Sequence, residues 1–523
     1  MIELGPADRP CSGSSREGEA PLSFVRRAGL MALGAAALTG SLAAFRAEAS
    51  RRPGADGCSP VPGESPLGAA QGGLEAAMPP LLVDPATGRL APDSAAALPA
   101  WIFSPSTKIV GLGEATHGTR EINEVRAAIV LEIAARTEGP LVFLIEDEFV
   151  RAAALDVYLE SGTGDAATCL KALRNIWWKN RELARLMERL RALRLARPDL
   201  RIVFRGVDMQ DIDRILARLA EAAQALGAGP AVAADLSAVA ADIEVYVSAA
   251  AEMMKAYARR PAFDYAPTVA ARRRALAALA RLRAAFAAAP GPGLSARERA
   301  LHIHTVRVAE QSLWKMDPLA TANFAFGDDP RVKAWLDGVA APIAAADLAP
   351  GPWDARDGAM AENAEALVAL EGPGARGVFW AHNGHVSREP RPDNRPAGAF
   401  LRSRLGEGYR AIGTEFYAGR FLSAPGDRIR TFNLNASPPS YFANAAARLC
   451  QQAGMLDLTA LSGDLSRALA RPFDLHSIGG DYDPSRRPDR GVLGEMFDGL
   501  VFVRNTSAAE LLPRRPPKAA GGA

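Results

Sequence analysis

Residues 141–148 read LVFLIEDE, and this stretch decides the fold. Its first five residues are all apolar, which is typical of a strand buried on both faces of a parallel sheet. Short apolar runs of the same kind occur at residues 109–112 and 202–204. The segments around them have helical periodicity, at residues 119–137, 149–161 and 181–196. This alternation predicts an α/β fold with a mostly parallel central sheet and flanking helices.

Strand-like runs return in the second half of the chain, at residues 377–380, 409–413, 429–433 and 499–503. Between the two sets lies a stretch without strand signals, rich in alanine and arginine. We predict a helical insertion there, at residues 226–345, that divides the α/β core into residues 99–225 and residues 346–505. Inside the insertion, Ser295 and Glu298 have the spacing of a helix capping box.

The amino-terminal segment has the features of an export signal. Arg26-Arg27 precedes an uncharged, weakly apolar run at residues 28–45, and Ala47-Glu48-Ala49 supplies a small-residue cleavage pattern. Paired arginines before such a run are typical of the twin-arginine route, so we expect a periplasmic or secreted protein. We predict an export signal over residues 1–49. A linker and N-terminal segment rich in proline and glycine would follow over residues 50–98, and a disordered tail over residues 506–523.

Composition narrows the classes of partner. The chain of 523 residues is 49% hydrophobic and 23% charged, with a formal net charge of +2. Such a balanced charge gives no argument for binding nucleic acid. No second apolar run is long enough to cross a bilayer, so we expect no stable membrane insertion once the signal is removed.

Polar residues follow five of the predicted strands at the point where each strand ends. In an open parallel sheet, ligands bind outside the carboxyl ends of the strands, so these side chains should meet in one crevice. Three of the six histidines of the chain lie at such ends, whereas His302, His304 and His476 are expected to be structural. The residues at the strand ends are Glu114, His117, Glu146, Asp208, His382, His385 and Glu415.

Arg126 gives a further indication of a polar site. It lies between Ile122 and Val130 at helical spacing, within or beside the apolar stripe of the first predicted helix. A guanidinium in such a position is costly unless it is paired, and we expect Glu114 or Glu146 to be its partner.

The chain carries a set of motifs that together resemble the erythromycin esterase family, over about residues 105–505. These motifs are Gly113-Glu-Ala-Thr-His-Gly118, Arg126, Glu146, Trp177-Trp178, Gly206-Val-Asp208, Arg356-Asp357-x-x-Met360-Ala-Glu-Asn363 and Trp380-Ala-His-Asn-Gly-His385. The resemblance implies an α/β core with a helical part, and hydrolysis of an ester or macrolactone without a required metal or other cofactor. It implies that His117 is the general base, that Glu114 and Glu146 orient it, that Arg126 holds the carboxylates, and that His382 or His385 contacts the reacting carbonyl. The remaining motif residues and Glu415 are assigned to substrate binding: Trp177, Trp178, Asp208, Arg356, Asn363 and Glu415.

Two other functions remain open at this stage. The same Glu and His residues have the nitrogen and oxygen donors that zinc or manganese takes, which would make a metal-dependent hydrolase or peptidase. A non-catalytic binding module of the cell envelope is the third possibility. The chain has no Gly-x-Ser-x-Gly motif, which argues against a serine hydrolase of the usual α/β type.

Overall fold

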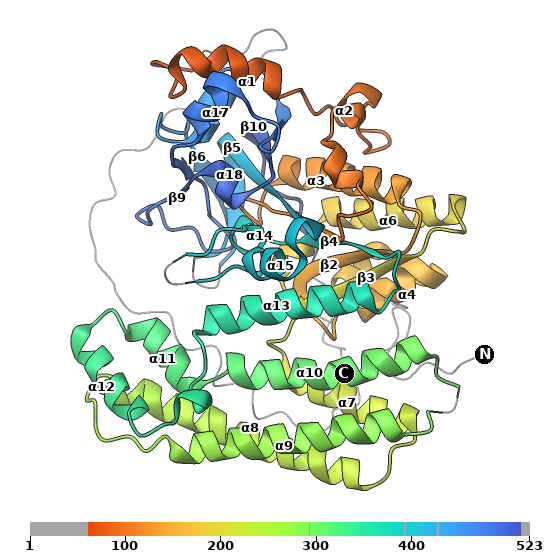
Figure 1. Ribbon diagram of the computed structural model, residues 1–523, viewed down its shortest axis with the longest axis vertical. Helices are drawn as coiled ribbons and strands as arrows, with labels where there is room; N and C mark the ends of the chain where they lie inside the picture. The colour runs from red at the N-terminus through yellow and green to blue at the C-terminus, as the bar shows by residue number, and fades with distance from the viewer. Residues whose placement is uncertain (1–60, 292, 392–393, 426–427, 514–523) are drawn as a thin grey trace, which may run out of the picture.

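The computed structural model describes residues 61–291, 293–391, 394–425 and 428–513 (Figure 1). Its central sheet has the strand order β3-β2-β4-β1-β5-β10-β7, and β6 pairs with β5 beyond this path. The strands are β1 (Ile109–Leu112), β2 (Leu141–Glu148), β3 (Ile202–Asp208), β4 (Arg376–Trp380), β5 (Tyr409–Ser423), β6 (Arg430–Leu434), β7 (Ala453–Asp457) and β10 (Gly499–Thr506). A separate antiparallel pair is formed by β8 (Phe473–Leu475) and β9 (Asp489–Gly491).

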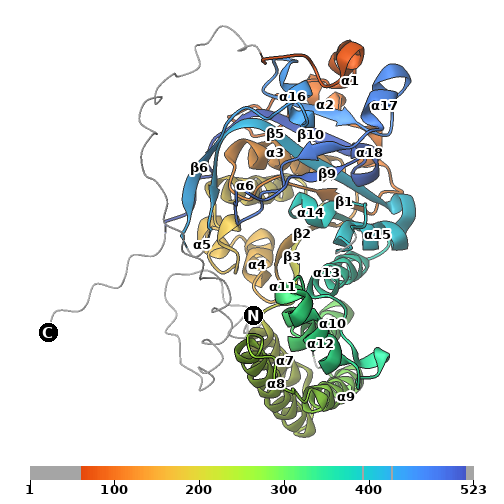
Figure 2. The ribbon, with the colours of Figure 1, turned by 90° about the vertical axis from the view of Figure 1, so that its left-hand side faces the viewer.

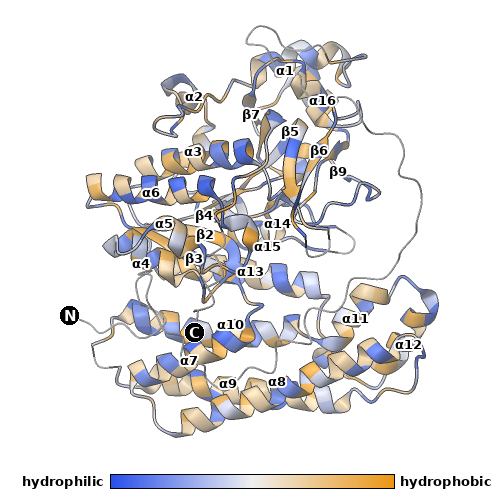
Figure 3. Ribbon diagram, turned by 180° about the vertical axis from the view of Figure 1, so that it is seen from behind, coloured by the Kyte–Doolittle hydropathy of each residue, from blue (hydrophilic) through white to orange (hydrophobic). Residues whose placement is uncertain are grey.

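The central sheet is mostly parallel, as predicted. The five pairings among β3, β2, β4, β1, β5 and β10 are all parallel, and only β6 and β7 pair antiparallel with their neighbours. Side chains alternate between the two faces of β2. Val142 and Leu144 join one core cluster, while Leu141, Phe143 and Ile145 join the other. The apolar strands lie at the centre of the molecule (Figure 3).

Helices cover both faces of the sheet, which explains why its strands carry continuous apolar runs. One core cluster includes residues of α3 (Arg120–Arg136), α4 (Ala153–Ser161) and α6 (Arg181–Ala196). The other includes residues of α7 (Ile212–Leu226), α10 (Ala296–Lys315), α13 (Pro352–Ala369) and α15 (Ala397–Leu405). Shorter helices are α5 (Ala166–Leu170), α14 (Asn383–Val386), α16 (Phe442–Ala447), α17 (Gly463–Leu469) and α18 (Leu493–Met496).

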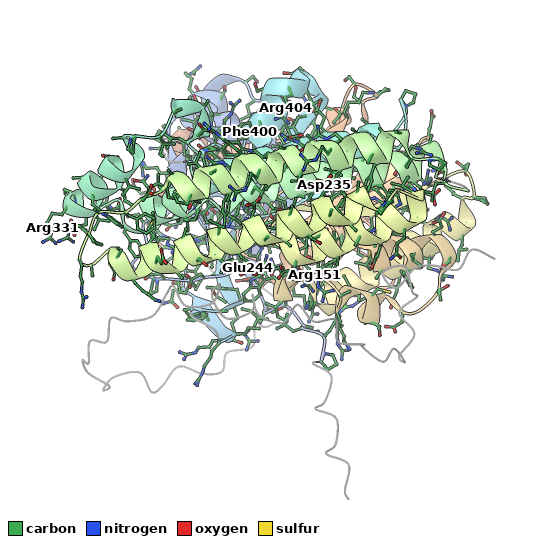
Figure 4. The ribbon with its side chains drawn as sticks, turned by 90° about the horizontal axis from the view of Figure 1, so that it is seen from below. Arg151, Asp235, Glu244, Arg331, Phe400 and Arg404 are labelled. Atoms are coloured by element: carbon green, nitrogen blue, oxygen red, sulfur yellow. The ribbon has the colours of Figure 1, made fainter. Side chains whose placement is uncertain are left out.

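The predicted helical insertion forms a layer beyond α13 (Figures 1 and 2). It contains α10 together with α8 (Ala231–Ala256), α9 (Ala266–Ala288), α11 (Pro318–Phe326) and α12 (Pro330–Ala340). The layer begins earlier than predicted, because α7, which was expected in the α/β core, packs against α8 and α10. The capping box of Ser295 and Glu298 is present at the start of α10. Seen from below, α8 and α9 lie side by side (Figure 4), and an ion pair between Asp235 and Arg281 joins them. No helix within the described part of the chain is long and apolar enough to cross a membrane.

Two predicted boundaries need correction. Part of the segment predicted as a linker is folded, because α1 (Gln71–Ala77) buries Leu74, and the amide of Leu81 donates to the carbonyl of Ala453. α2 (Pro92–Ala96) follows it. The tail predicted to be disordered from residue 506 is ordered as far as residue 512, where its backbone bonds to the loop before α3 and to the segment before α6. The predicted export signal and residues 514–523 lie outside the described residues.

β5 is also longer than predicted. The apolar run stops at residue 413, but β5 continues to Ser423, since β10 pairs with it as far as Gly419 and β6 pairs with it from Gly419 to Ser423. Thr414 and Glu415 therefore lie inside a strand and not beyond its end. α3 begins directly after Thr119, within the helical range of residues 119–137 that the sequence predicts. Thr119 is its N-cap residue, but the Thr119 side chain makes no capping hydrogen bond.

Candidate active site

The candidate site lies at the carboxyl ends of β1, β2, β3 and β4. His117 is carried by the loop between β1 and α3, and this loop is held on two sides. The amide of Ala115 donates to Thr414 Oγ1 at 2.9 Å, and Thr116 forms a β-bridge with Gly479. The amide of Asn383, which follows β4, donates to the carbonyl of Glu114 at 2.8 Å. The loop is thus fixed by segments that are remote in the sequence.

His117 is oriented by a buried chain of charges. Its Nδ1 lies 2.5 Å from Glu114 Oε1, and the other oxygen of Glu114 pairs with Arg126. Arg126 also donates to the carbonyls of Leu112 at 2.7 Å and Ala381 at 3.2 Å. Burial lowers the pKa of Arg126 to about 10, so its guanidinium is still charged at neutral pH. The predicted partner Glu114 is thereby confirmed over Glu146.

Aromatic rings surround the imidazole of His117. Trp177 stacks on it with ring centroids 6.4 Å apart, and Trp178 meets it edge-on at 5.1 Å. The ring of His382 lies 5.3 Å away. Within the described residues, Nε2 of His117 has no hydrogen-bond partner, whereas Nδ1 is occupied by Glu114. The free nitrogen is therefore the one that can accept a proton.

The hydrogen bonds of His382 assign its tautomer. Its Nδ1 accepts the amide proton of Gly384 at 3.1 Å, so the neutral ring carries its proton on Nε2. Burial and the neighbouring His117 lower the pKa of His382 to about 3, which keeps the ring neutral. The nearest acceptor for Nε2–H is the carbonyl of Ala115, at a long 3.4 Å. His382 can thus donate a hydrogen bond to a ligand beside His117.

His385 is in the opposite protonation state. Its Nδ1 lies 2.7 Å from Asp357 Oδ1, and its Nε2 lies 3.1 Å from Glu146 Oε1. Burial opposes the charged form, but these two carboxylates raise the pKa of His385 to about 10. The imidazolium in turn acts on Glu146: although burial favours the neutral acid, His385 and Arg356 hold the pKa of Glu146 well below its usual range.

Arg356 joins the ends of β2 and β3. It donates to Glu146 at 3.0 Å and to Asp208 at 2.7 Å, and it lies against Nε2 of His385 at 3.2 Å. Burial alone would raise the pKa of Asp208, but Arg356 lowers it below its usual value. Burial also disfavours the charge of Arg356, but Asp208 and Glu146 raise the pKa of its guanidinium. Glu146, Asp208 and His385 thus come together, as their positions at the strand ends predicted. Arg356, which the resemblance assigned to substrate binding, pairs with all three.

Asp147 positions the tryptophan pair. Its two oxygens accept three backbone N–H groups, from Glu148 at 2.8 Å, Arg174 at 2.9 Å and Asn175 at 2.7 Å. This fixes the start of the short segment that carries Trp177 and Trp178. The indole of Trp178 also donates to the carbonyl of Glu146 at 2.7 Å.

Two of the predicted substrate-binding residues have structural roles. Asn363 donates to the carbonyl of Val207 and bonds His304, so it joins α13 to β3 and α10. Glu415 is fully buried, and its oxygens accept the amides of Phe416 and His476. Neither side chain reaches the cluster around His117. The structural role expected for His304 is confirmed by its bond to Asn363.

Several residues of the site were not predicted from the sequence. Asp357 was part of a quoted motif, and its position directly after Arg356 was the available signal. Asn383 exchanges two hydrogen bonds with the backbone of Thr414, at 3.0 Å and 2.7 Å. Gly479, with φ of +56°, lies so close that a Cβ there would be 3.9 Å from His382 Nε2. No local pattern marks Gly479, because its contact with the site is long-range.

Metal binding is not favoured by the arrangement of donors. Among the described residues, no group of three or more His, Cys, Asp or Glu side chains could hold a metal ion. Both nitrogens of His385 face carboxylates, and Glu114 and Glu146 are paired with arginines. The donors of the metal alternative therefore do not fit a shared ion.

The parallel sheet, the helical layer and a Glu–His pair at the strand ends define an α/β protein with the layout of an enzyme. The chain belongs to the erythromycin esterase family: the family model described as erythromycin esterase matches residues 136–506. This range includes Glu146, His382 and His385 and begins after His117. Membership indicates a hydrolase.

Solved structures show the same fold. A Bacillus cereus protein has a TM-score of 0.64 and 22% identity, with 85% of this chain and 98% of that chain covered. A structure described as a succinoglycan biosynthesis protein has a TM-score of 0.60 and 18% identity, with 84% of this chain and 98% of that chain covered. A mutant of the erythromycin esterase EreC in its open conformation has a TM-score of 0.51 and 16% identity, with 82% of this chain and 97% of that chain covered.

Proposed function

We propose that this protein hydrolyses a carboxylic ester or lactone, with His117 as the general base. The observation that carries the proposal is the 2.5 Å contact of His117 Nδ1 with Glu114, which leaves Nε2 free beside the ring of His382. A neutral imidazole held in this tautomer can take a proton from water, and the adjacent carboxylate stabilises the imidazolium that forms.

The proposed reaction needs only groups of this chain and one water molecule. The water oxygen bonds to the carbonyl carbon while its proton passes to His117 Nε2. The carbonyl π electrons move to oxygen, where His382 Nε2–H donates a hydrogen bond to the developing charge. Collapse of the intermediate breaks the bond to the alcohol oxygen, which takes the proton from His117. The products are a carboxylic acid, which ionises in water, and an alcohol.

The ion-paired group of His385, Arg356 and Glu146 has a positioning role in this proposal. His385 and Arg356 fix the carboxylate of Glu146, which accepts the backbone N–H of His382 at 3.0 Å. Glu146 thereby holds the start of α14 and with it the ring of His382. Of the two candidate histidines, we therefore assign contact with the reacting carbonyl to His382 and the positioning role to His385.

Hydrolysis of a panel of simple esters, lactones and macrolides, followed by mass spectrometry, tests the reaction. We expect His117→Ala to lower kcat by at least about 100-fold, the range for removal of a general base. His304→Gln is the matched control, because this histidine bonds Asn363 outside the cluster. Equal rates for His117→Ala and the wild type on every substrate would reject the proposal.

A chelator tests whether the chemistry needs a metal. We propose a metal-independent mechanism, supported by the pairing of the Glu and His donors with one another and with arginines. Activity should survive dialysis against EDTA, and elemental analysis of active protein should give less than one equivalent of zinc or manganese. Loss of activity that either metal restores would favour the metal-dependent alternative.

Export is a proposal that follows from the sequence alone. We propose that Arg26-Arg27 directs the chain through the twin-arginine route to the periplasm or the exterior. Fusion of residues 1–60 to a reporter protein, with and without the change of both arginines to lysine, tests this. A reporter that stays in the cytoplasm in both forms contradicts the proposal.

A further inference from the structure

Exposed aromatic side chains gather at one end of the helical layer. Of the large apolar side chains exposed in the described residues, three are aromatic: Tyr257 at 37%, Phe324 at 56% and Trp353 at 38%. Phe324 lies on α11 and Trp353 on α13, and their rings meet edge to face with centroids 5.9 Å apart. Tyr257 stacks on Phe326, also of α11. Exposed apolar side chains that contact one another, as Phe324 and Trp353 do, are a feature of binding surfaces.

This aromatic pair adjoins the catalytic cluster. The ring centroid of Trp353 lies 6.3 Å from that of His385, and the guanidinium carbon of Arg356 lies 5.7 Å from the Trp353 ring. The spacing explains the contact, because Trp353 precedes Arg356 by three residues and Asp357 by four, so all three share one face of α13. The same helix face thus carries buried site residues and, one turn earlier, an exposed indole.

The position of Trp353 is fixed although its ring is exposed. It is the second residue of α13, after Pro352. Asp354 accepts the amide of Arg395 at 2.6 Å, and Arg356 and Asp357 are bound within the cluster. A rigidly held indole loses little conformational entropy when a ligand stacks on it. The exposed faces of the Trp353 indole and the Phe324 ring are apolar, so the suitable ligand is an uncharged ring with an apolar face.

We propose that Trp353 and Phe324 form a specificity platform that binds the apolar face of an uncharged ring of the substrate, next to the reacting ester. This inference rests on the proposed function and adds a substrate class to it: an ester whose acyl or alcohol part carries a ring. The helical layer contributes Phe324, so it takes part in choosing the substrate.

Three esters test the platform by pH-stat assay. Ethyl acetate has no ring, whereas cyclohexyl acetate and ethyl cyclohexanecarboxylate carry one on the alcohol or acyl side. We expect the wild type to prefer at least one ring ester in kcat/KM. Trp353→Ala and Phe324→Ala should each reduce this preference, measured as the ratio of kcat/KM for the ring ester to kcat/KM for ethyl acetate, by up to about 10-fold, the range of one aromatic contact. A preference unaffected by both variants, or none in the wild type, overturns the platform.

Leu195→Ala is the matched control. Leu195 is 60% exposed and lies in the last turn of α6, about 20 Å along that helix from its start near Trp178. It should leave the ratio of ring ester to ethyl acetate unchanged. A loss of the ratio in all three variants would show a general effect of surface truncation and reject the platform.

A binding measurement separates the platform from the reaction. If the wild type hydrolyses none of the esters, the proposed function fails, and the platform is then tested with Nile red, an uncharged fused-ring dye. Fluorescence titration should give a Kd that is several-fold larger for the double variant Trp353→Ala/Phe324→Ala than for the wild type and for Leu195→Ala. Equal Kd values for all three proteins would reject the platform independently of any catalysis.

Discussion

Replacement of Glu114 by glutamine removes one negative charge from the centre of the site while keeping the size of the side chain. In the native protein this carboxylate has two tasks: it binds Nδ1 of His117 at 2.5 Å and it neutralises Arg126, whose side chain is 1% exposed. The amide oxygen can accept from only one of these two donors, and the amide NH2 that faces the other donor cannot accept a hydrogen bond. The amide cannot stabilise an imidazolium or balance a buried guanidinium, so the variant tests both tasks.

Loss of the first task should lower kcat, and loss of the second should lower the free energy of unfolding. Without the carboxylate, the proton of water must pass to an imidazole whose cation is no longer stabilised. We expect kcat to fall by about 100- to 10,000-fold, the range for general-base catalysis and its orienting carboxylate. An uncompensated buried charge costs about 3–5 kcal/mol. Arg126 keeps its bonds to two carbonyls and its position 3.6 Å above the Trp380 ring, so we expect the lower end of this range.

Urea unfolding followed by circular dichroism measures the free energy of unfolding, and the pH-stat measures the rate. The double variant Glu114→Gln/Arg126→Met separates the effects, because it also removes the unbalanced charge. It should regain most of the stability and none of the rate. Glu132→Gln is the control, because Glu132 lies on α3, as Arg126 does. Glu132 pairs with Arg89 and Arg136, whose side chains are 40% and 42% exposed, so solvent screens both lost pairs and the cost should be about 1 kcal/mol or less.

Two results would refute this reasoning. If Glu114→Gln keeps kcat within about threefold of the wild type, Glu114 does not assist His117 in the rate-limiting step. If the double variant is no more stable than Glu114→Gln, the lost stability does not come from an unbalanced guanidinium.

Three further predictions follow from the same contacts. The pKa of His385 is raised to about 10, so its ion pairs stabilise the fold fully below about pH 6.5, and this contribution is lost as the pH rises to 10. Urea unfolding of His385→Gln should lack this alkaline decline, and a parallel decline in both proteins contradicts the assignment. Burial lowers the pKa of His476 to about 3, so the fold loses stability as the pH falls from about 6.5 toward 3. His476→Asn should lose less stability between pH 6.5 and 4, and an equal loss argues against a buried neutral ring. Asp147→Asn should release backbone N–H groups at Arg174 and Asn175, raise hydrogen exchange there and lower kcat/KM by about 10-fold; unchanged exchange would show that this carboxylate does not hold the tryptophan segment.

The convergence of the site could be predicted because parallel strands align their ends. Leu112 of β1 and Ile145 of β2 both pair with Trp380 of β4, so the apolar runs of the three strands stop at one level, although β2 itself continues to Glu148. Residues that follow these positions, such as Glu114 and Glu146, must then lie near one another. Apolar runs in the sequence were sufficient to locate these ends.

Glu415 shows where the same argument fails. The apolar run before it stops, but the strand continues because β10 and β6 supply partners for its backbone. Which residues pair is decided by segments up to about a hundred positions away, and a single run of side chains carries no record of them. The ordered residues beyond 506 were missed for the same reason, since their partners belong to the loop before α3 and the segment before α6.

The different roles of His382 and His385 also depend on contacts that the sequence does not display. Both belong to one short motif, yet one ring is neutral and the other is a cation. His385 lies between Asp357 and Glu146, whereas His382 has a backbone N–H on one nitrogen and His117 as its neighbour. Which of the two rings lies between carboxylates depends on the positions of α13 and β2, which carry Asp357 and Glu146.

This division of charge limits which group can move protons. The imidazolium of His385 and the guanidinium of Arg356 keep Glu146 ionised, so this carboxylate cannot serve as a general acid at neutral pH. The same carboxylate keeps His385 protonated, so His385 cannot serve as a base. His382 resists protonation, since a cation there would be buried beside His117. Within this cluster, the only imidazole nitrogen with neither a fixed proton nor a hydrogen-bond partner is Nε2 of His117, and the proposed reaction therefore assigns both proton transfers to it.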